Sequence, residues 1–325
     1  MIPLQTSLFR RAALAACLAV LAVLGAAAPC RGEGRLFAIV AKSESDANFV
    51  RVYTTARAEA MLNGDTVILV GGKGEAHFRI QDAEVRSVLK RRPDGLAISV
   101  LRSNYLAENS FVAVHKAGIP VVTFDSDFTG RAMGLRAGYI GTDNRTLGVL
   151  LALEARALRP EGGVVAILTG GLDDTNLNDR MRGVRAGLGI GEENSGWTLS
   201  RRSPLPCRDN YDQALDQLEL LLDDPEVDVI ISVGWWAQMA GDYEQRMARY
   251  KGVLDSGRKV LIFAGAIDRQ VKLLEKGLNH VNIGLNFEEM GRQVYLALKT
   301  LADGESIPPM TYIPVRVFRA PSVDK

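Results

Sequence analysis

Two neighbouring stretches of sequence determine how this chain is organised. Residues 118–127 read Gly-Ile-Pro-Val-Val-Thr-Phe-Asp-Ser-Asp, and residues 139–148 read Tyr-Ile-Gly-Thr-Asp-Asn-Arg-Thr-Leu-Gly. Each begins as a short apolar run typical of a buried strand and ends in polar side chains. Ligands of open parallel α/β sheets bind at the carboxyl ends of strands, so Asp125 is expected to accept hydrogen bonds from a ligand rather than to serve only in a turn. Asn144 is expected to cap a helix that begins at Arg145.

The same alternation of strand and helix patterns extends from Arg35 to the C-terminus. Strands are predicted at residues 36–41, 66–70, 95–100, 119–124, 164–168, 197–199, 227–233, 260–264, 281–285 and 312–318. Helices are predicted at residues 49–60, 79–91, 104–117, 145–158, 179–188, 212–222, 237–250, 271–275 and 288–301. This order predicts an α/β fold of two doubly wound parallel-sheet lobes. No low-complexity linker separates them, as expected for a hinged bilobed protein.

The bulk properties fit a protein with two domains of ordinary size. The chain has 325 residues, of which 47% are hydrophobic and 24% charged, with a net charge of +1. These values are normal for a globular protein, and the charge gives no indication of a nucleic acid partner. Aromatic residues make up only 6% of the chain, so a cluster of them in a candidate site is informative.

The N-terminus is predicted to be a signal peptide over residues 1–32. Arg10-Arg11 precedes an almost unbroken apolar run over residues 12–28, as in secretory signals. A retained membrane anchor is the alternative, but the run is short of the roughly 20 residues that a spanning helix needs. The chain is therefore expected in the periplasm. Cys17 would leave with the signal, and the sequence leaves open whether Cys30 does.

The sequence holds no motif that predicts catalysis, a metal site or a cofactor. His77, His115 and His280 lack metal-ligand spacing. Asp125 and Asp127 are two residues apart on an extended segment, so their side chains are expected to point in opposite directions rather than to form an acid–base pair. An enzyme is thus the function class that the sequence supports least.

Aromatic residues and an arginine lie near the predicted strand ends and helix starts. Phe49, Tyr211, Trp235 and Trp236 could pack on the apolar faces of sugar rings, although core packing is the simpler interpretation for Phe49. Adjacent tryptophans cannot both enter one core, so at least one is expected to face a cleft or an interface. Arg180, at a predicted helix start, is either an exposed helical arginine or a ligand contact.

Several segments together resemble the type I periplasmic solute-binding proteins of the ribose-binding, LacI-like group. They are residues 118–125, 140–144, 179–183 (Asp-Arg-Met-Arg-Gly), 224–231 (Asp-Pro-Glu-Val-Asp-Val-Ile-Ile), Lys276-Gly277 and 302–305. The resemblance implies a ligand site between two lobes and a hinge of three strands near Thr142, Leu285 and Pro314. The implied N-terminal lobe is 35–142 plus 287–313, and the implied C-terminal lobe is 143–286 plus 314–325.

The resemblance also implies which positions contact the ligand. In the first lobe and the following helix start, the family's contact positions fall on Asp46, Asn48, Phe49, Asp125, Ser126, Asn178, Arg180 and Tyr211. Three contact positions of the second lobe depart from the family pattern and hold Gly234, Ala266 and Leu285. Asp268, Trp235 and Trp236 are the nearby residues that could replace the lost contacts. The departures predict a ligand less hydroxylated than ribose, or a cleft that mainly serves signalling.

The function implied is capture of a small ligand, of the sugar or polyol class, for delivery to an ABC import permease. The alternative is a periplasmic sensory protein that presents its ligand to a membrane histidine kinase or chemoreceptor. A LacI-type transcription regulator is disfavoured by the export signal and by the lack of a helix-turn-helix segment before Arg35. The identity of the ligand and the choice between transport and sensing stay open at this stage.

Overall fold

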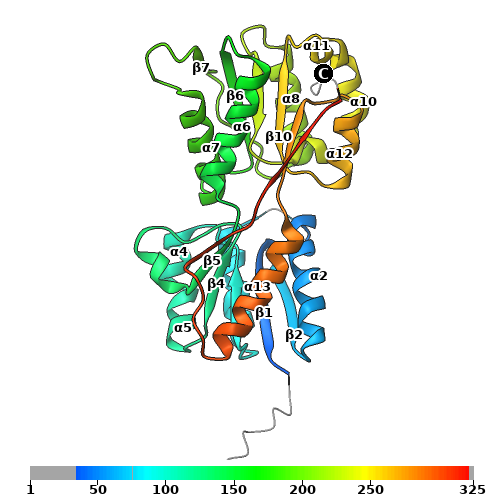
Figure 1. Cartoon of the computed structure of the whole chain (residues 1–325). Helices are drawn as coiled ribbons and strands as arrows, with labels where there is room; N and C mark the ends of the chain where they lie inside the picture. Colours follow the sequence, from blue (N-terminus) through cyan, green and yellow to red (C-terminus); the bar gives the residue numbers. More distant parts are fainter. Residues whose placement is uncertain (1–33, 75, 322–325) are drawn as a thin grey trace, which may run out of the picture. The chain divides into compact units, whose positions relative to one another are not determined.

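The computed structural model describes residues 34–74 and 76–321, and its contacts group the chain from Arg35 onward into one compact unit. The predicted signal peptide and Cys30 lie outside the described residues. Among these residues, no helix is both long enough and apolar enough to cross a membrane. Two separate β-sheets form the frame of this unit, and each belongs to one lobe (Figure 1).

The first lobe is built on a six-stranded sheet in which every neighbouring pair of strands is parallel. The strand order is β12-β5-β4-β3-β1-β2. Its elements are β1 (Leu36–Ser43), α2 (Ala47–Leu62), β2 (Thr66–Gly72), α3 (Phe78–Leu89), β3 (Gly95–Ile98), α4 (Ser103–Glu108), α5 (Ser110–Lys116), β4 (Val121–Phe124), the 3-10 helix η1 (Gly130–Leu135), β5 (Gly138–Gly141), α13 (Phe287–Ala302) and β12 (Met310–Tyr312).

The second lobe is built on a seven-stranded sheet that is parallel except at one edge. The strand order is β13-β11-β10-β9-β6-β7, with β8 also paired to β6 and β13 antiparallel to β11. Its elements are α6 (Asn144–Leu158), β6 (Gly163–Thr169), α7 (Thr175–Leu188), β7 (Trp197–Leu199), β8 (Leu205–Pro206), α8 (Tyr211–Asp223), β9 (Val229–Ser232), α9 (Trp236–Met239), α10 (Tyr243–Met247), the 3-10 helix η2 (Ala248–Tyr250), α11 (Lys251–Asp255), β10 (Val260–Ala264), α12 (Asp268–Glu275), β11 (Val281–Gly284) and β13 (Arg316–Arg319).

Helices cover both faces of each sheet because the strands are apolar on both sides. In β1, Phe37 and Ile39 pack in the core with α2 and α13, while Ala38 and Val40 pack in the core with α3 and α5. This alternation follows from the two-residue period of a strand. Figure 1 shows α13 beside α2 on one face of the first sheet. The expected α/β fold with two doubly wound lobes is therefore confirmed.

The chain passes between the two sheets three times. One passage follows β5, one follows β11, and one lies between β12 and β13. The last strand predicted at 312–318 is thus two strands, because residues 313–315 leave the first sheet before β13 joins the second.

Three other local predictions need correction. The helix predicted at 104–117 is interrupted at Asn109, whose φ and ψ of −117° and −102° are not helical. The helix predicted at 237–250 is broken into short helices after Ala240, which has an extended ψ of 138°. Asp143, not Asn144, caps α6: its carboxylate accepts a hydrogen bond from the Thr146 amide at 3.0 Å.

Candidate functional site: a cavity between the two lobes

A cavity of about 560 Å³ lies between the lobes at the carboxyl ends of strands from both sheets. The first lobe contributes the segment after β1 and the residue after β4. The second lobe contributes the start of α7, the loop before α8 and the segments after β9 and β10. Such a volume is within the range of small-molecule sites in proteins, and its position is where α/β sheets bind ligands.

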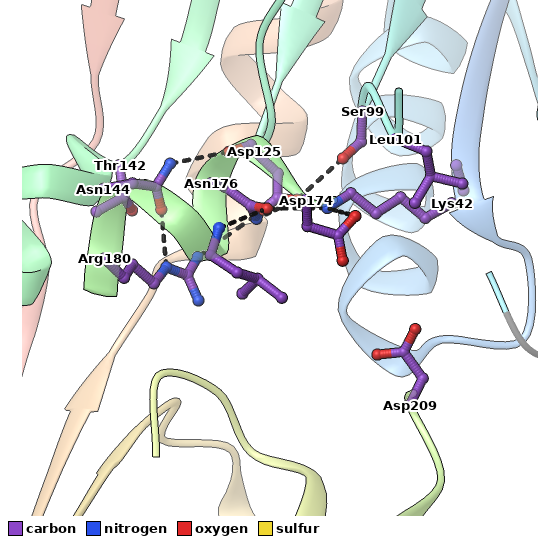
Figure 2. Close-up of polar contacts among 12 residues, drawn as sticks. Lys42, Ser99, Leu101, Asp125, Thr142, Asn144, Asp174, Asn176, Arg180 and Asp209 are labelled. Carbon is purple, nitrogen blue, oxygen red and sulfur yellow. Dashed lines mark hydrogen bonds and ion pairs between the residues drawn. The ribbon is translucent and has the colours of Figure 1, made fainter. Parts of the chain in front are cut away.

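Asp125 is a central polar residue of this cavity (Figure 2). It follows β4 in the left-handed backbone region, with a φ of 57°, which turns its carboxylate away from the strand direction. An aspartate tolerates this conformation better than most residues, but it is uncommon enough to indicate a functional position. The side chain of Ser99 donates to Oδ2 at 2.9 Å, and the Asn176 amide donates to both carboxylate oxygens at 3.2 and 3.1 Å.

Arg180 enters the same cluster from the first turns of α7 and is only 5% exposed. Its Nε donates to the Asn144 side chain at 2.8 Å, its Nη1 donates to the Val233 carbonyl at 2.9 Å, and its Nη2 lies 3.7 Å from Asp125 Oδ1. Burial lowers the pKa of the guanidinium from its ordinary value, and the Asp125 charge opposes this shift. Asn144 also donates to the Asp125 carbonyl at 3.0 Å, so it connects the two charged residues.

Three further polar residues complete the cluster, and none was singled out from the sequence. Lys42, at the end of β1, donates to Asn176 Oδ1 at 3.0 Å. Its ammonium also lies 3.7 Å from Asp125 and 3.7 Å from Asp174. Asn176 and Asp174 belong to the second lobe, so these contacts cross from one lobe to the other. The one feature of the sequence that indicates Lys42, Asp174 and Asn176 is their position after predicted strands.

The two tryptophans form part of the second-lobe wall, and both line the cavity at 6% exposure. The Trp236 ring lies against Gly170 and Gly234, where an added Cβ would come within 2.4 and 2.3 Å of the ring. Its indole nitrogen donates to Asp209 Oδ1 at 2.7 Å. Gly234 thus makes room for the aromatic ring, because a side chain at this position would overlap it. Both tryptophans belong to the hydrophobic core of the second lobe, so the expectation that adjacent tryptophans cannot enter one core is wrong, although both also line the cavity.

A fully buried network of side-chain amides supports this wall from behind. Gln238 Oε1 accepts from Gln270 at 2.5 Å and from Asn282 at 3.1 Å, and Gln238 Nε2 donates to Asn279 at 3.1 Å. Asn282 also donates to the carbonyl of Gly265, a cavity-lining residue, at 2.8 Å. Buried amides are costly unless they are hydrogen-bonded. Their mutual bonding fixes the segments after β9 and β10 relative to each other.

Three acidic residues, Asp46, Asp209 and Asp212, lie on the walls of the cavity in addition to the Asp125 cluster. Asp46 caps α2 and accepts from the Asn48 amide at 2.8 Å, and Asp209 lies in the loop before α8. Burial raises the pKa of Asp46 to about 7, and the charges of Asp125 and Asp209 act in the same direction. Burial and the charges of Asp46 and Asp209 also raise the pKa of Tyr211.

The cavity brings together eight of the eleven residues predicted as ligand contacts: Asp46, Asn48, Phe49, Asp125, Arg180, Tyr211, Trp235 and Trp236. Phe49 also packs edge-on against Phe124, so it serves the core and the wall together.

The other three predicted contacts, Ser126, Asn178 and Asp268, do not line the cavity. Ser126 is fully buried directly after Asp125, which adopts the left-handed conformation. Asn178 donates to the Leu172 carbonyl at 2.8 Å, and Asp268 is exposed in the first turn of α12. In residues 34–74 and 76–321, no group of three or more potential ligands is placed to hold a metal ion.

Comparisons with known proteins agree with this architecture. The sequence profile of the family described as periplasmic binding protein domain matches residues 37–306. GanP, a glucose-galactose binding protein from Geobacillus stearothermophilus, is 20% identical, with 88% of this chain and 98% of that one covered and a TM-score of 0.77. An ABC transporter solute-binding protein from Burkholderia graminis, in complex with D-arabinose, is 22% identical, with 88% and 96% covered and a TM-score of 0.75.

A third solved structure, described as a XylFII-LytSN complex, is 18% identical, with 88% of this chain and 98% of that chain covered and a TM-score of 0.72. At these identities the likeness establishes the fold alone. A search of curated proteins found no match. The profile match spans most of the chain and the two-lobed fold is shared, so the chain belongs to the periplasmic binding proteins of type I.

Proposed function

We propose that this protein is an exported, non-enzymatic solute-binding protein that captures a small ligand of the sugar or polyol class between its lobes. Its role would be delivery of that ligand to an ABC import permease. The observation that carries the proposal is the 560 Å³ cavity, lined from both lobes by hydrogen-bonding groups and aromatic faces. Carboxylates and amides pair with hydroxyl groups, and aromatic rings cover the apolar faces of sugars.

Closure around the ligand is the proposed mechanism. The bodies that move would be residues 35–142 with 287–313, and residues 143–286 with 314–321, which meet at the three connections between the sheets. Asp125 and Arg180 are held ready by Ser99 and Asn144, so these groups need little rearrangement when a ligand arrives. A preorganised polar site binds more tightly because less ordering is required on binding.

A sensory role is the second candidate, in which the closed protein presents its ligand to a membrane histidine kinase or chemoreceptor. The observation that favours it is the similarity to a protein solved in the XylFII-LytSN complex. Co-purification from the native host separates the two roles. Recovery of a permease supports import, and recovery of a kinase or chemoreceptor supports sensing.

A thermal-unfolding screen of the purified mature protein against monosaccharides and polyols tests ligand capture. A ligand present at roughly a hundred times its dissociation constant is expected to stabilise the native state by about 2.7 kcal/mol. At least one compound should raise the melting temperature in a saturable way. If no compound in a broad panel does so, the proposed ligand class is wrong.

A further inference from the structure

The cavity lining holds more negatively than positively charged side chains, and the positive ones lie close to only some of the carboxylates. Among the residues that the structure describes, its lining holds five aspartates, Asp46, Asp125, Asp174, Asp209 and Asp212, but only the two cations Lys42 and Arg180. Lys42 lies 3.7 Å from both Asp125 and Asp174, and Arg180 lies 3.7 Å from Asp125. Lys42 is therefore placed against Asp125 and Asp174, and Arg180 is placed against Asp125 alone.

Asp46 is left without such compensation among the residues that the structure describes. Its Oδ1 accepts one hydrogen bond, from the Asn48 amide, and it takes part in no ion pair there. Burial raises its pKa to about 7, the charges of Asp125 and Asp209 act in the same direction, and Lys42 opposes them only as a smaller contribution. A carboxylate in this environment gains from any cation that enters the cavity.

Aromatic rings occupy the same part of the cavity. Tyr211 follows Asp209 and Asn210 along the chain, and its phenol lies within the electrostatic reach of Asp46 and Asp209. Trp236 donates to Asp209 from its indole nitrogen, which fixes that carboxylate beside the ring. Carboxylates and aromatic faces together form the environment that favours a substituted ammonium group.

We propose that the ligand carries a protonated amino group, as an amino sugar or amino polyol does, and that this group binds between Asp46 and the aromatic residues of the second-lobe wall. The inference rests on the proposed function and narrows its ligand class. The hydroxyl groups of such a ligand would pair with the Asp125, Asn176 and Arg180 cluster. Gly234 and Leu285, which also line the cavity, offer no side-chain hydrogen bond, and this fits a ligand with fewer hydroxyl groups to satisfy there.

Calorimetric titration with matched ligands tests this inference. Each set holds one neutral sugar, its amino form and its N-acetyl form, for example glucose, glucosamine and N-acetylglucosamine, and the same three forms of galactose and mannose. In at least one set the amino form is expected to bind about tenfold tighter than both neutral forms. The neutral sugar controls for size because a hydroxyl group replaces the amine, and the N-acetyl form keeps the nitrogen but removes its charge.

Two variants locate the contact. Asp46→Asn keeps a residue that caps helices well, so α2 is expected to fold, and it should bring the affinity ratio of amino to neutral form close to one. Asp179→Asn, on α7 and outside the cavity lining, should leave the ratio unchanged. A ratio unaffected by Asp46→Asn would overturn the assignment of the contact to Asp46.

The possible failures are distinguishable from each other. If neutral sugars bind as tightly as their amino forms in every set, the inference is wrong while the proposed function stands. If neither kind binds, and the thermal screen is also negative, both are wrong. At a pH low enough to keep the ligand's amine fully protonated, binding of the amino form should also release protons, because a bound cation favours the ionised form of Asp46. Absence of proton release would contradict the ion pair.

Discussion

At the scale of single residues, Asp125 has the clearest role, because Ser99, Asn176, Lys42 and Arg180 all converge on its carboxylate. Asp125→Ala is expected to weaken ligand binding by about 1–3 kcal/mol, since buried donors lose their acceptor. Calorimetry with the best compound of the screen measures the loss. Asp127→Ala is a local comparison: its carboxylate pairs with Arg136 outside the cavity, so affinity should be kept even if stability falls. Equal affinity of wild type and Asp125→Ala would remove Asp125 from the site.

Because the pKa of Asp46 is raised in the folded protein, the free energy of unfolding is expected to fall as the pH rises. Its pKa is about 7 in the folded protein and near the ordinary 3.8 when unfolded, so the folded state binds more protons between these values. The contribution of Asp46 to the free energy of unfolding is therefore complete below about pH 4 and is lost as the pH rises through about 7.

The variant Asp46→Asn should remove this dependence. Relative to wild type, it is expected to gain on the order of 1–3 kcal/mol of unfolding free energy between about pH 5 and about pH 8. Denaturant titrations of both proteins at the two pH values measure the difference. A constant difference across this range would show that Asp46 does not titrate there.

At the scale of secondary-structure elements, the wall formed after β9 and β10 depends on the amides behind it. Gln238→Leu removes the side chain that joins Gln270, Asn279 and Asn282, and leaves buried polar groups unpaired. The variant is expected to lose about 2–4 kcal/mol of unfolding free energy. Gln213→Leu, on the exposed face of α8, serves as the matched control and should change stability by less than about 0.5 kcal/mol. Similar stabilities of the two variants in urea titration would show that the network contributes little.

The elements also show what a single sequence can predict. The strands and most helices were predicted because the spacing of apolar residues is a local feature of the sequence. Asp125, Trp235 and Trp236 were predicted as ligand contacts because they follow apolar strands, and all three line the cavity. Lys42, Asp174 and Asn176 lie in the strand-end segments 42–46 and 170–176 that the sequence indicates, but their pairing was not predicted because it crosses between lobes and no local spacing encodes it. Ser126 is fully buried and Asp268 is exposed at a helix start, so neither lines the cavity, and the sequence pattern alone does not reveal this.

At the scale of the whole molecule, the lobes are connected by two kinds of contact that differ in expected strength. Asn176 is 4% exposed and bridges Lys42 and Asp125, whereas the Arg102–Asp173 pair at 2.6 Å is exposed at the surface. Exposed ion pairs contribute little, while buried hydrogen bonds to charged groups contribute more. Asn176→Ala should therefore shift the ligand-free protein toward an open state, and Arg102→Ala should not.

Small-angle X-ray scattering of the two ligand-free variants and wild type checks this contrast. The radius of gyration should increase for Asn176→Ala and match wild type for Arg102→Ala. The same radius for all three proteins, or an increase confined to Arg102→Ala, would show that the buried cluster does not hold the lobes together.

The central claim is that one small ligand is held between the two lobes, and hydrogen–deuterium exchange with the best compound of the screen tests it most directly. Ligand should slow exchange on both sides of the cavity at once, in residues 42–50 of the first lobe and in residues 174–181 and 209–213 of the second. The outer helices α3 and α10 should exchange as before. Protection restricted to one lobe, or located on an outer surface, would contradict capture between the lobes.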